Sequence, residues 1–306
     1  MWAYTLRRVL SAIPTVFVVI TVCYLLLHVT PGGPFDSDRK VSEAVLANLQ
    51  AKYHLDLPLW QQYLLYLKGL LQGDLGASFR YADWSVNDLV AKALPVSLSI
   101  GGVAMLLSVL IGVGLGIMAA LRQNSMIDHF VMLLGNVGSA VPSFVLGPVL
   151  IIVLAIGLQW LPAGGWHDFE VRFMILPIVL LTIINVATIG RVMRGSLIEV
   201  MHSGFIRTSR AKGLPTRVVV MRHALKPALL PVVSVLGPLA ISSITAALVT
   251  ETVFSLPGLG KLIVNGAGNR DYTLVLGLVV LITLLTVTLN LLVDLAYAWL
   301  DPKIRY

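Results

Sequence analysis

Six long apolar stretches constrain this chain more than any other feature of its sequence. A helix needs roughly 20 apolar residues to cross about 30 Å of hydrocarbon. The stretches of that length are residues 9–29, 94–120, 130–158, 173–193, 228–249 and 274–299. In the whole chain 57% of residues are apolar and 12% are charged, against about 45–50% and 25% in soluble domains. We therefore expect an all-α integral membrane protein with six transmembrane helices.

The basic residues predict how these helices are oriented. With the N-terminus inside, the short outer loops contain Arg172, Lys261 and Arg270. The inner segments contain 13 basic residues: Arg7, Arg8, Arg122, Arg191, Arg194, Arg207, Arg210, Lys212, Arg217, Arg222, Lys226, Lys303 and Arg305. Because cytoplasmic loops carry the excess of Lys and Arg, both termini are expected in the cytoplasm. The first stretch exceeds a signal-peptide core of about 7–15 residues, so we expect an uncleaved anchor.

The chain is expected to divide at residue 93. Residues 1–93 would form the first span and a long periplasmic loop, and residues 94–306 a five-helix core. In the loop, Asp56 is a candidate cap before Pro58, and apolar residues follow at helical spacing. Ser85 and Asp88 have capping-box spacing. We expect short amphipathic helices here, either against the outer membrane surface or over the pore mouth; a structural lid without a specific partner is the alternative.

Two spans contain residues that interrupt helices. The third has Gly135, Gly138, Pro142, Gly147 and Pro148, which predict a kinked or broken helix. Pro231 and Pro238 lie in the fifth span, ahead of a run of small polar residues. Candidate pathway-lining residues in the third, fourth and fifth spans are Asn136, Ser139, Asn185, Thr188, Ser242, Ser243 and Thr245. Hydrogen bonding to a neighbouring helix is the alternative role for each of them.

The sequence argues against an enzyme or a nucleic-acid-binding protein. Its six histidines are scattered without metal-ligand spacing, so no catalytic residues and no metal site are predicted. The fragment Pro257–Lys261 resembles a phosphate loop but has Leu262 where Ser or Thr would hold magnesium. No basic stripe with interleaved aromatic residues indicates nucleic acid. Glu251 and Asp294 lie at span ends and are expected to be interfacial or salt-bridged, which leaves no proton relay.

One inner segment, residues 194–227, is large enough to bind another protein. It contains seven basic residues and one acidic residue, Glu199. Residues 208–212 have helical propensity, and Gly213 before Leu214-Pro215 is a stop signal. A second short helix is expected to end at Pro227. A solvated basic loop that only sets topology is the alternative. The residues of interest at its centre are Ser203, Gly204, Phe205, Ile206, Arg207, Thr208, Ser209, Arg210, Ala211, Lys212 and Gly213.

At this segment the sequence resembles a family. The pattern Arg207-Thr208-Ser209-x-x-x-Gly213 is similar to the "EAA" motif of permease subunits of ATP-binding-cassette importers. Ser209 replaces the usual small Ala, and Lys226 interrupts the family's downstream Ile-x-Leu-Pro pattern. Leu6-Arg7-Arg8, Pro31-Gly32 and the run from Thr250 to Gly260 also resemble the dipeptide and oligopeptide branch. The resemblance covers nearly the whole chain and is greatest to B-type permeases of oligopeptide importers.

The resemblance implies a type I importer permease fold in the inner membrane. The expected partners are a homologous second permease, two ATPase subunits and a periplasmic peptide-binding protein. ATP and Mg would bind to the ATPases, with no cofactor on this chain, and residues 203–213 would be the coupling helix. The importer would carry oligopeptides, with dipeptide, nickel or glutathione as alternatives. An alternative from another functional class is a stand-alone secondary transporter or channel.

Overall fold

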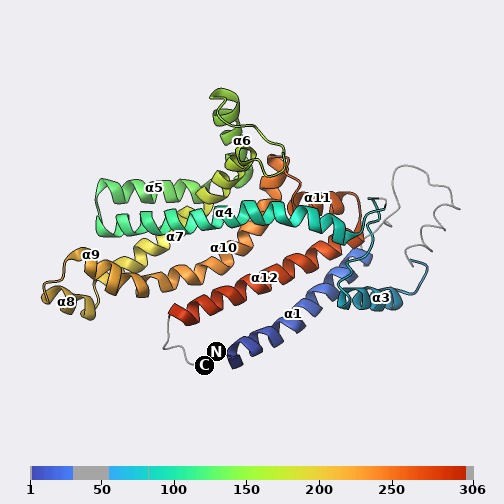
Figure 1. Cartoon of the computed structure of the whole chain (residues 1–306), viewed down its shortest axis with the longest axis horizontal. Helices are drawn as coiled ribbons and strands as arrows, with labels where there is room; N and C mark the ends of the chain where they lie inside the picture. The colour runs from blue at the N-terminus through green and yellow to red at the C-terminus, as the bar shows by residue number, and fades with distance from the viewer. Residues whose placement is uncertain (1, 30–54, 82, 301–306) are drawn as a thin grey trace.

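The computed structural model describes residues 2–29, 55–81 and 83–300, and in these ranges the protein is helical (Figure 1). An isolated bridge between Ala77 and Ser85 is the one extended pairing within them. The α-helices are α1 (Trp2–Val29), α3 (Leu59–Leu71), α4 (Val86–Leu121), α5 (Met126–Ala140), α6 (Ser143–Leu150), α7 (Val171–Met201), α8 (Gly204–Ala211), α9 (Thr216–Val218), α10 (Leu225–Val253), α11 (Leu259–Gly268) and α12 (Tyr272–Leu300). Two π-helical segments, η1 (Ile151–Gly157) and η2 (Val219–Ala224), continue α6 and α9.

The expected number of spans agrees with these helices. Five helical stretches are long and apolar enough to cross a membrane: Leu10–Val29, Val86–Leu121, Val171–Met201, Thr216–Ala240 and Tyr272–Ala296. A sixth span results if the bent pair Met126–Gly138 and Ser143–Gly157 counts as one. The two halves of that pair meet at 106°. The break predicted for the third span is therefore confirmed.

Proline 142 marks this break. It is the N-cap residue of α6, with an extended ψ of 143°, and has no amide hydrogen to continue α5. A second proline, Pro148, lies inside α6, and the π-helical segment η1 follows it. The third span thus changes direction at one proline and changes helix type after another.

Three expectations about helix ends were wrong. The segment after Ser85 is not a separate short helix, because it forms the first turns of the 36-residue α4. Helix α4 continues through Pro95, so residue 93 lies inside a helix. Asp56 does not cap α3, because Pro58 is its N-cap residue. Pro227 does not end a second short helix: it lies in the first turn of α10, where a missing amide hydrogen costs little. The predicted capping box of Ser85 and Asp88 is present.

The centre of the fold is the close packing of α4 against α7. A Cβ atom at Gly112 would lie 2.8 Å from Ile189, and one at Gly116 would lie 2.6 Å from Cβ of Met193 and 2.7 Å from the carbonyl oxygen of Gly190. Side chains larger than hydrogen would force these helices apart. Small residues at the crossing let two backbones approach closely, as is usual between membrane helices.

The first and last helices lie beside each other at the edge of the bundle. In Figure 1 the first turn of α1 and the last turn of α12 are together, and α3 lies at the opposite end of α1. Arg8 Nε lies 3.2 Å from a carboxylate oxygen of Asp294, which joins the two helices near the chain termini. Asp294 is thus salt-bridged, one of the two roles expected for it.

Candidate functional site: the basic segment after α7 and the polar contacts between spans

The basic segment contains a helix where one was predicted, although the helix begins earlier. Helix α8 covers Gly204–Ala211, which is four residues more at its start than the predicted stretch 208–212. Ser203 is the N-cap residue, but its hydroxyl donates to the carbonyl oxygen of Val200 at 2.6 Å instead of capping α8. The hydroxyls of Thr208 and Ser209 also donate to backbone oxygens within α8, at 3.1 and 2.9 Å. These hydroxyls are directed at their own backbone.

One buried side chain attaches α8 to the spans. Ile206 is 0% exposed and belongs to an apolar cluster with residues of α7, η2 and α10, among them Met193, Leu197, Val219 and Ala228. Because this cluster includes the end of α7 and the start of α10, α8 is packed against both helices that enter and leave the segment. Helix α8 thus shares one apolar cluster with two spans.

Apart from Ile206, α8 and its C-terminal end are largely exposed and positively charged. Phe205 is half exposed, and Arg207, Thr208, Arg210, Ala211 and Lys212 are exposed. Three cations therefore lie beside one exposed aromatic ring and small residues on this segment.

Gly213 ends α8 in the left-handed conformation, with φ of 77°. Its amide donates to the carbonyl oxygen of Arg210 at 2.9 Å. Space around it is open, since a Cβ atom there would meet nothing within 4 Å. The glycine is thus required by backbone conformation and not by close packing. The stop signal predicted from the sequence is confirmed.

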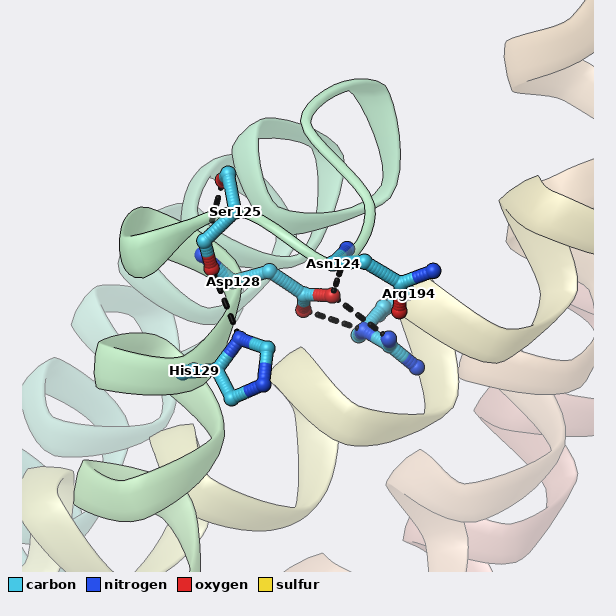
Figure 2. Close-up of polar contacts among 5 residues, drawn as sticks. All are labelled: Asn124, Ser125, Asp128, His129 and Arg194. Carbon is cyan, nitrogen blue, oxygen red and sulfur yellow. Dashed lines mark hydrogen bonds and ion pairs between the residues drawn. The ribbon is translucent and has the colours of Figure 1, made fainter.

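A buried ion pair holds the start of α5 against the end of α7 (Figure 2). The carboxylate of Asp128 accepts from Nε of Arg194 at 2.5 Å, from Nη2 of Arg194 at 2.7 Å and from the amide of Asn124 at 2.9 Å. Asp128 is 2% exposed. Ser125 caps α5 through the amide of Asp128, and its carbonyl oxygen lies 2.8 Å from Nδ1 of His129. Helix α7 ends seven residues after Arg194, and the loop that contains α8 follows it.

The ion pair between Asp128 and Arg194 was not predicted from the sequence, where Arg194 is one of the basic residues of the inner segments. The spacing of Ser125 and Asp128 is a helix-start signal that could have placed the carboxylate at the beginning of α5. The partner could not have been deduced, since Asp128 and Arg194 are 66 residues apart in the chain.

The structure brings two of the candidate pathway residues together. Nδ2 of Asn185 in α7 donates to Oγ of Ser243 in α10 at 2.9 Å, and both side chains are buried. Asn136, which is exposed in α5, instead accepts from Nη2 of Arg191 at 3.3 Å. The hydroxyl of Ser242 is exposed and donates to the carbonyl oxygen of Leu239. These contacts give Asn185 and Ser243 a bond between helices, which was the alternative role.

The remaining pathway candidates are Thr188, Ser139 and Thr245. Thr188 is half buried in α7, one turn from Asn185. Ser139 and Thr245 lie in α5 and α10, but their side chains are outside the described part of the structure. A cavity of about 240 Å³ lies between α4, α5 and α7, and its lining is mainly apolar, with Arg191 among the lining residues.

At the outer end, Glu251 closes the turn between α10 and α11. Its buried carboxylate accepts from Oγ of Ser97 at 2.5 Å and from the amides of Gly260 and Lys261 at 2.7 and 3.2 Å. A carboxylate at a helix N-terminus is favourably placed toward the helix dipole. Glu251 therefore caps α11, a role that sequence analysis missed when it expected an interfacial or salt-bridged side chain.

The same turn explains the glycines of the phosphate-loop-like fragment. A Cβ atom at Gly258 would lie 2.2 Å from the Glu251 carboxylate, and one at Gly260 would lie 2.5 Å from Cα of Leu248. The amides that a phosphate would need are already bound to Glu251. The fragment is thus a tight structural turn.

A second buried carboxylate joins the next turn to the loop between α3 and α4. Asp271 precedes α12 and accepts from the hydroxyl of Ser78, the amide of Phe79 at 3.1 Å and the amide of Leu274 at 3.2 Å. It is 0% exposed. The loop between α3 and α4 is thereby fixed against the start of α12.

The arrangement defines a class of protein: a helical membrane protein with an exposed basic helix after a central span. Among solved structures, the chain matches an inward-facing MetNI methionine ABC transporter with a TM-score of 0.60 and 19% identity, over 70% of this chain and 96% of that one. This likeness shows the fold, the type I importer permease fold that was predicted.

The chain belongs to the family described as "Binding-protein-dependent transport system inner membrane component", which matches residues 112–306, and the N-terminal part of such components matches residues 1–101. It is 53% identical to the oligopeptide transport system permease protein OppB of Salmonella typhimurium and 52% identical to OppB of Escherichia coli, over the full length of both proteins. It is 39% identical to the dipeptide transport system permease protein DppB of Bacillus subtilis, over 99% of this chain and 97% of the relative. The family predicted from the sequence is confirmed.

Proposed function

We propose that this permease forms half of the translocation pathway of an ATP-driven importer for oligopeptides in the bacterial inner membrane. The observation that carries the proposal is the 53% identity to OppB, which extends over 306 residues without an unmatched domain on either side. A similarity of this extent covers the periplasmic loop and the basic segment as well as the spans. The dipeptide relative supports the same class of cargo, peptides, at lower identity.

In this proposal the partners are a homologous second permease, two ATPase subunits and a periplasmic peptide-binding protein. ATP and Mg bind to the ATPases, and this chain hydrolyses nothing. Helix α8 is the coupling helix, with Arg207, Arg210 and Lys212 directed at the ATPase. Its exposed basic surface and its attachment through Ile206 support this role.

Coupling would follow from the packing around Ile206. Because Ile206 shares one apolar cluster with α7 and α10, closure of the ATPases would displace α8 together with the inner ends of both spans. Rigid-body motion of packed helices is a common route between two states of a transporter. The spans would thereby alternate between inward-open and outward-open arrangements.

The spans would hold the cargo weakly, and the binding protein would select it. Within the described helices, the buried carboxylates Asp128, Glu251 and Asp271 all accept hydrogen bonds from this chain. A path without a dedicated ion-pair partner suits peptides whose side chains vary, because strong binding to one side chain would slow release. Peptide length is then set outside the membrane.

Reconstitution tests this proposal. The full complex in proteoliposomes should accumulate a labelled oligopeptide only with the binding protein outside and ATP at the ATPases, whereas the permease alone should give no flux. Uphill transport by the permease alone would establish the stand-alone transporter instead. Accumulation of labelled dipeptide, nickel or glutathione, but not of labelled oligopeptide, would move the chain to another substrate class within the family.

A further inference from the structure

Helix α3 has two unlike sides, and only one of them contacts the described part of the protein. On the inner side, the hydroxyl of Tyr63 lies 2.6 Å from Oγ1 of Thr21 in α1. The rings of Tyr63 and Tyr66 lie 5.0 and 6.1 Å from that of Tyr24. No residue of α3 is buried. The helix therefore lies on the surface of the bundle.

The outer side of α3 is apolar. Leu71 is 90% exposed, Trp60 is 62% exposed and Leu64 is 54% exposed. At 100° per residue these three side chains fall within a sector of about 40°. Lys68, one turn after Leu64, is exposed beside them. We call Trp60, Leu64 and Leu71 the α3 stripe. Large apolar side chains gathered in this way do not usually face water.

The position of the stripe indicates what covers it. Thr21 and Tyr24, which bind α3, belong to the last turns of the candidate span Leu10–Val29. The same turns expose Leu25, Leu26 and Val29 on another side of α1. Figure 1 shows α3 beside the C-terminal end of α1. The α3 stripe thus adjoins the lipid-facing surface of a span at the level where that span ends.

The composition of the stripe fits the bilayer boundary. Tryptophan is enriched where membrane meets water, because its ring is largely apolar and its indole nitrogen is polar. Interfacial helices combine such a ring and leucines on one side with a basic residue near the headgroups. Trp60, Leu64, Leu71 and Lys68 supply this combination on one exposed side.

We propose that α3 is an interfacial membrane helix whose stripe of Trp60, Leu64 and Leu71 inserts into the outer leaflet of the lipid bilayer. Through Tyr63 and Tyr66 it holds the outer end of α1 at the membrane surface. The alternative occupant, a protein partner over the pore mouth, is an outcome of the test.

Spin labels measure this directly in the assembled transporter. Leu64→Cys is labelled in a Cys23→Ser background, and the complex is placed in nanodiscs of phosphatidylethanolamine and phosphatidylglycerol. Leu26→Cys is the control for a label that faces lipid. Asp56→Cys, at an exposed position before α3, is the control for a label in water. The ratio of oxygen to nickel-reagent collisions at Leu64 should exceed that at Asp56 by about threefold or more, as for a side chain inserted among acyl chains.

Two results would overturn the proposal. A collision ratio at Leu64 equal to that at Asp56 would place the stripe in water. An immobilised label at Leu64 that neither reagent reaches would show that a protein surface covers the stripe. If the Leu64→Cys transporter fails to assemble, Leu71→Cys is the second probe, since Leu71 is the most exposed residue of the stripe. The same two results at Leu71 would show that the stripe does not insert into lipid.

Discussion

The two ends of the helical bundle are connected in different ways. At the outer end, Glu251 and Asp271 are buried carboxylates that fix consecutive turns through backbone amides. At the inner end, the Asp128–Arg194 ion pair joins α5 to α7, but α8 itself is attached mainly by apolar packing at Ile206, and its charged side chains are exposed. Directional bonds resist displacement more than apolar packing does, because they weaken steeply with angle.

This difference suits a transporter driven from one side. The outer turns keep α10, α11 and α12 in a fixed mutual arrangement. The inner segment presents a surface that another protein can bind and move.

The largest effect is expected from Gly260→Ala at the outer turn. The added Cβ would meet Cα of Leu248 at 2.5 Å, a backbone contact that only a shift of α10 or α11 can relieve. We expect a loss of about 3 kcal/mol in the free energy of unfolding, measured by SDS titration of the detergent-extracted protein. Gly268→Ala, in the same helix with nothing within 4 Å, is the control. Equal effects of both changes would show that the turn is not tightly packed.

At the inner end, Asp128→Ala should destabilise the protein by a smaller amount. Removing one partner of a buried ion pair costs about 3–5 kcal/mol. Arg194 keeps 23% of its side-chain surface exposed, so water solvates part of its charge. We therefore expect a loss of about 2 kcal/mol in the same titration, the lower figure reflecting this solvation.

Arg194→Ala is the matched control for this pair. It leaves the buried Asp128 carboxylate with the Asn124 amide as its hydrogen-bond donor, and should cost at least as much. A smaller loss of unfolding free energy for Arg194→Ala than for Asp128→Ala would contradict the conclusion that Asp128 is the more buried partner.

Arg207→Glu should affect function without affecting the fold. Arg207 is exposed on α8, and reversal of its charge would repel an acidic partner. We expect peptide uptake in proteoliposomes to fall about tenfold, which corresponds to about 1.4 kcal/mol of docking free energy. Membrane yield and thermal stability of the permease should stay unchanged.

The control for Arg207→Glu is Arg222→Glu, the same charge reversal at an exposed position of η2 outside α8. Normal co-purification of the ATPases with the Arg207 variant, or an equal defect in the Arg222 variant, would count against α8 as the coupling helix.

The smallest effect is expected from Arg8→Ala. The pair with Asp294 joins the ends of α1 and α12, but the Arg8 side chain is 52% exposed. Exposed ion pairs contribute about 0.2–1 kcal/mol, so SDS titration should show a loss of about 0.5 kcal/mol. A loss comparable to that of Asp128→Ala would mean that the exposed inner ends of α1 and α12 are held as firmly as the helices joined by the buried ion pair.

The sequence predicted those features that depend on neighbouring residues. Spans follow from runs of apolar residues, the stop at Gly213 from a glycine before Leu-Pro, and the cap at Ser85 from a four-residue pattern. The error at Pro227 arose because a proline often signals a helix end but is also tolerated in a first turn, where Pro227 lies in α10.

By itself, the sequence determined that the protein is helical, crosses a membrane, carries an exposed basic helix and belongs to an importer permease family. The tertiary structure alone decided that Asp128 binds Arg194, that Glu251 caps α11, and that Asn185 pairs with Ser243. The physical reason is range. Apolar periodicity and backbone conformation act within a few residues, whereas a buried polar group must find its partner wherever the fold places one.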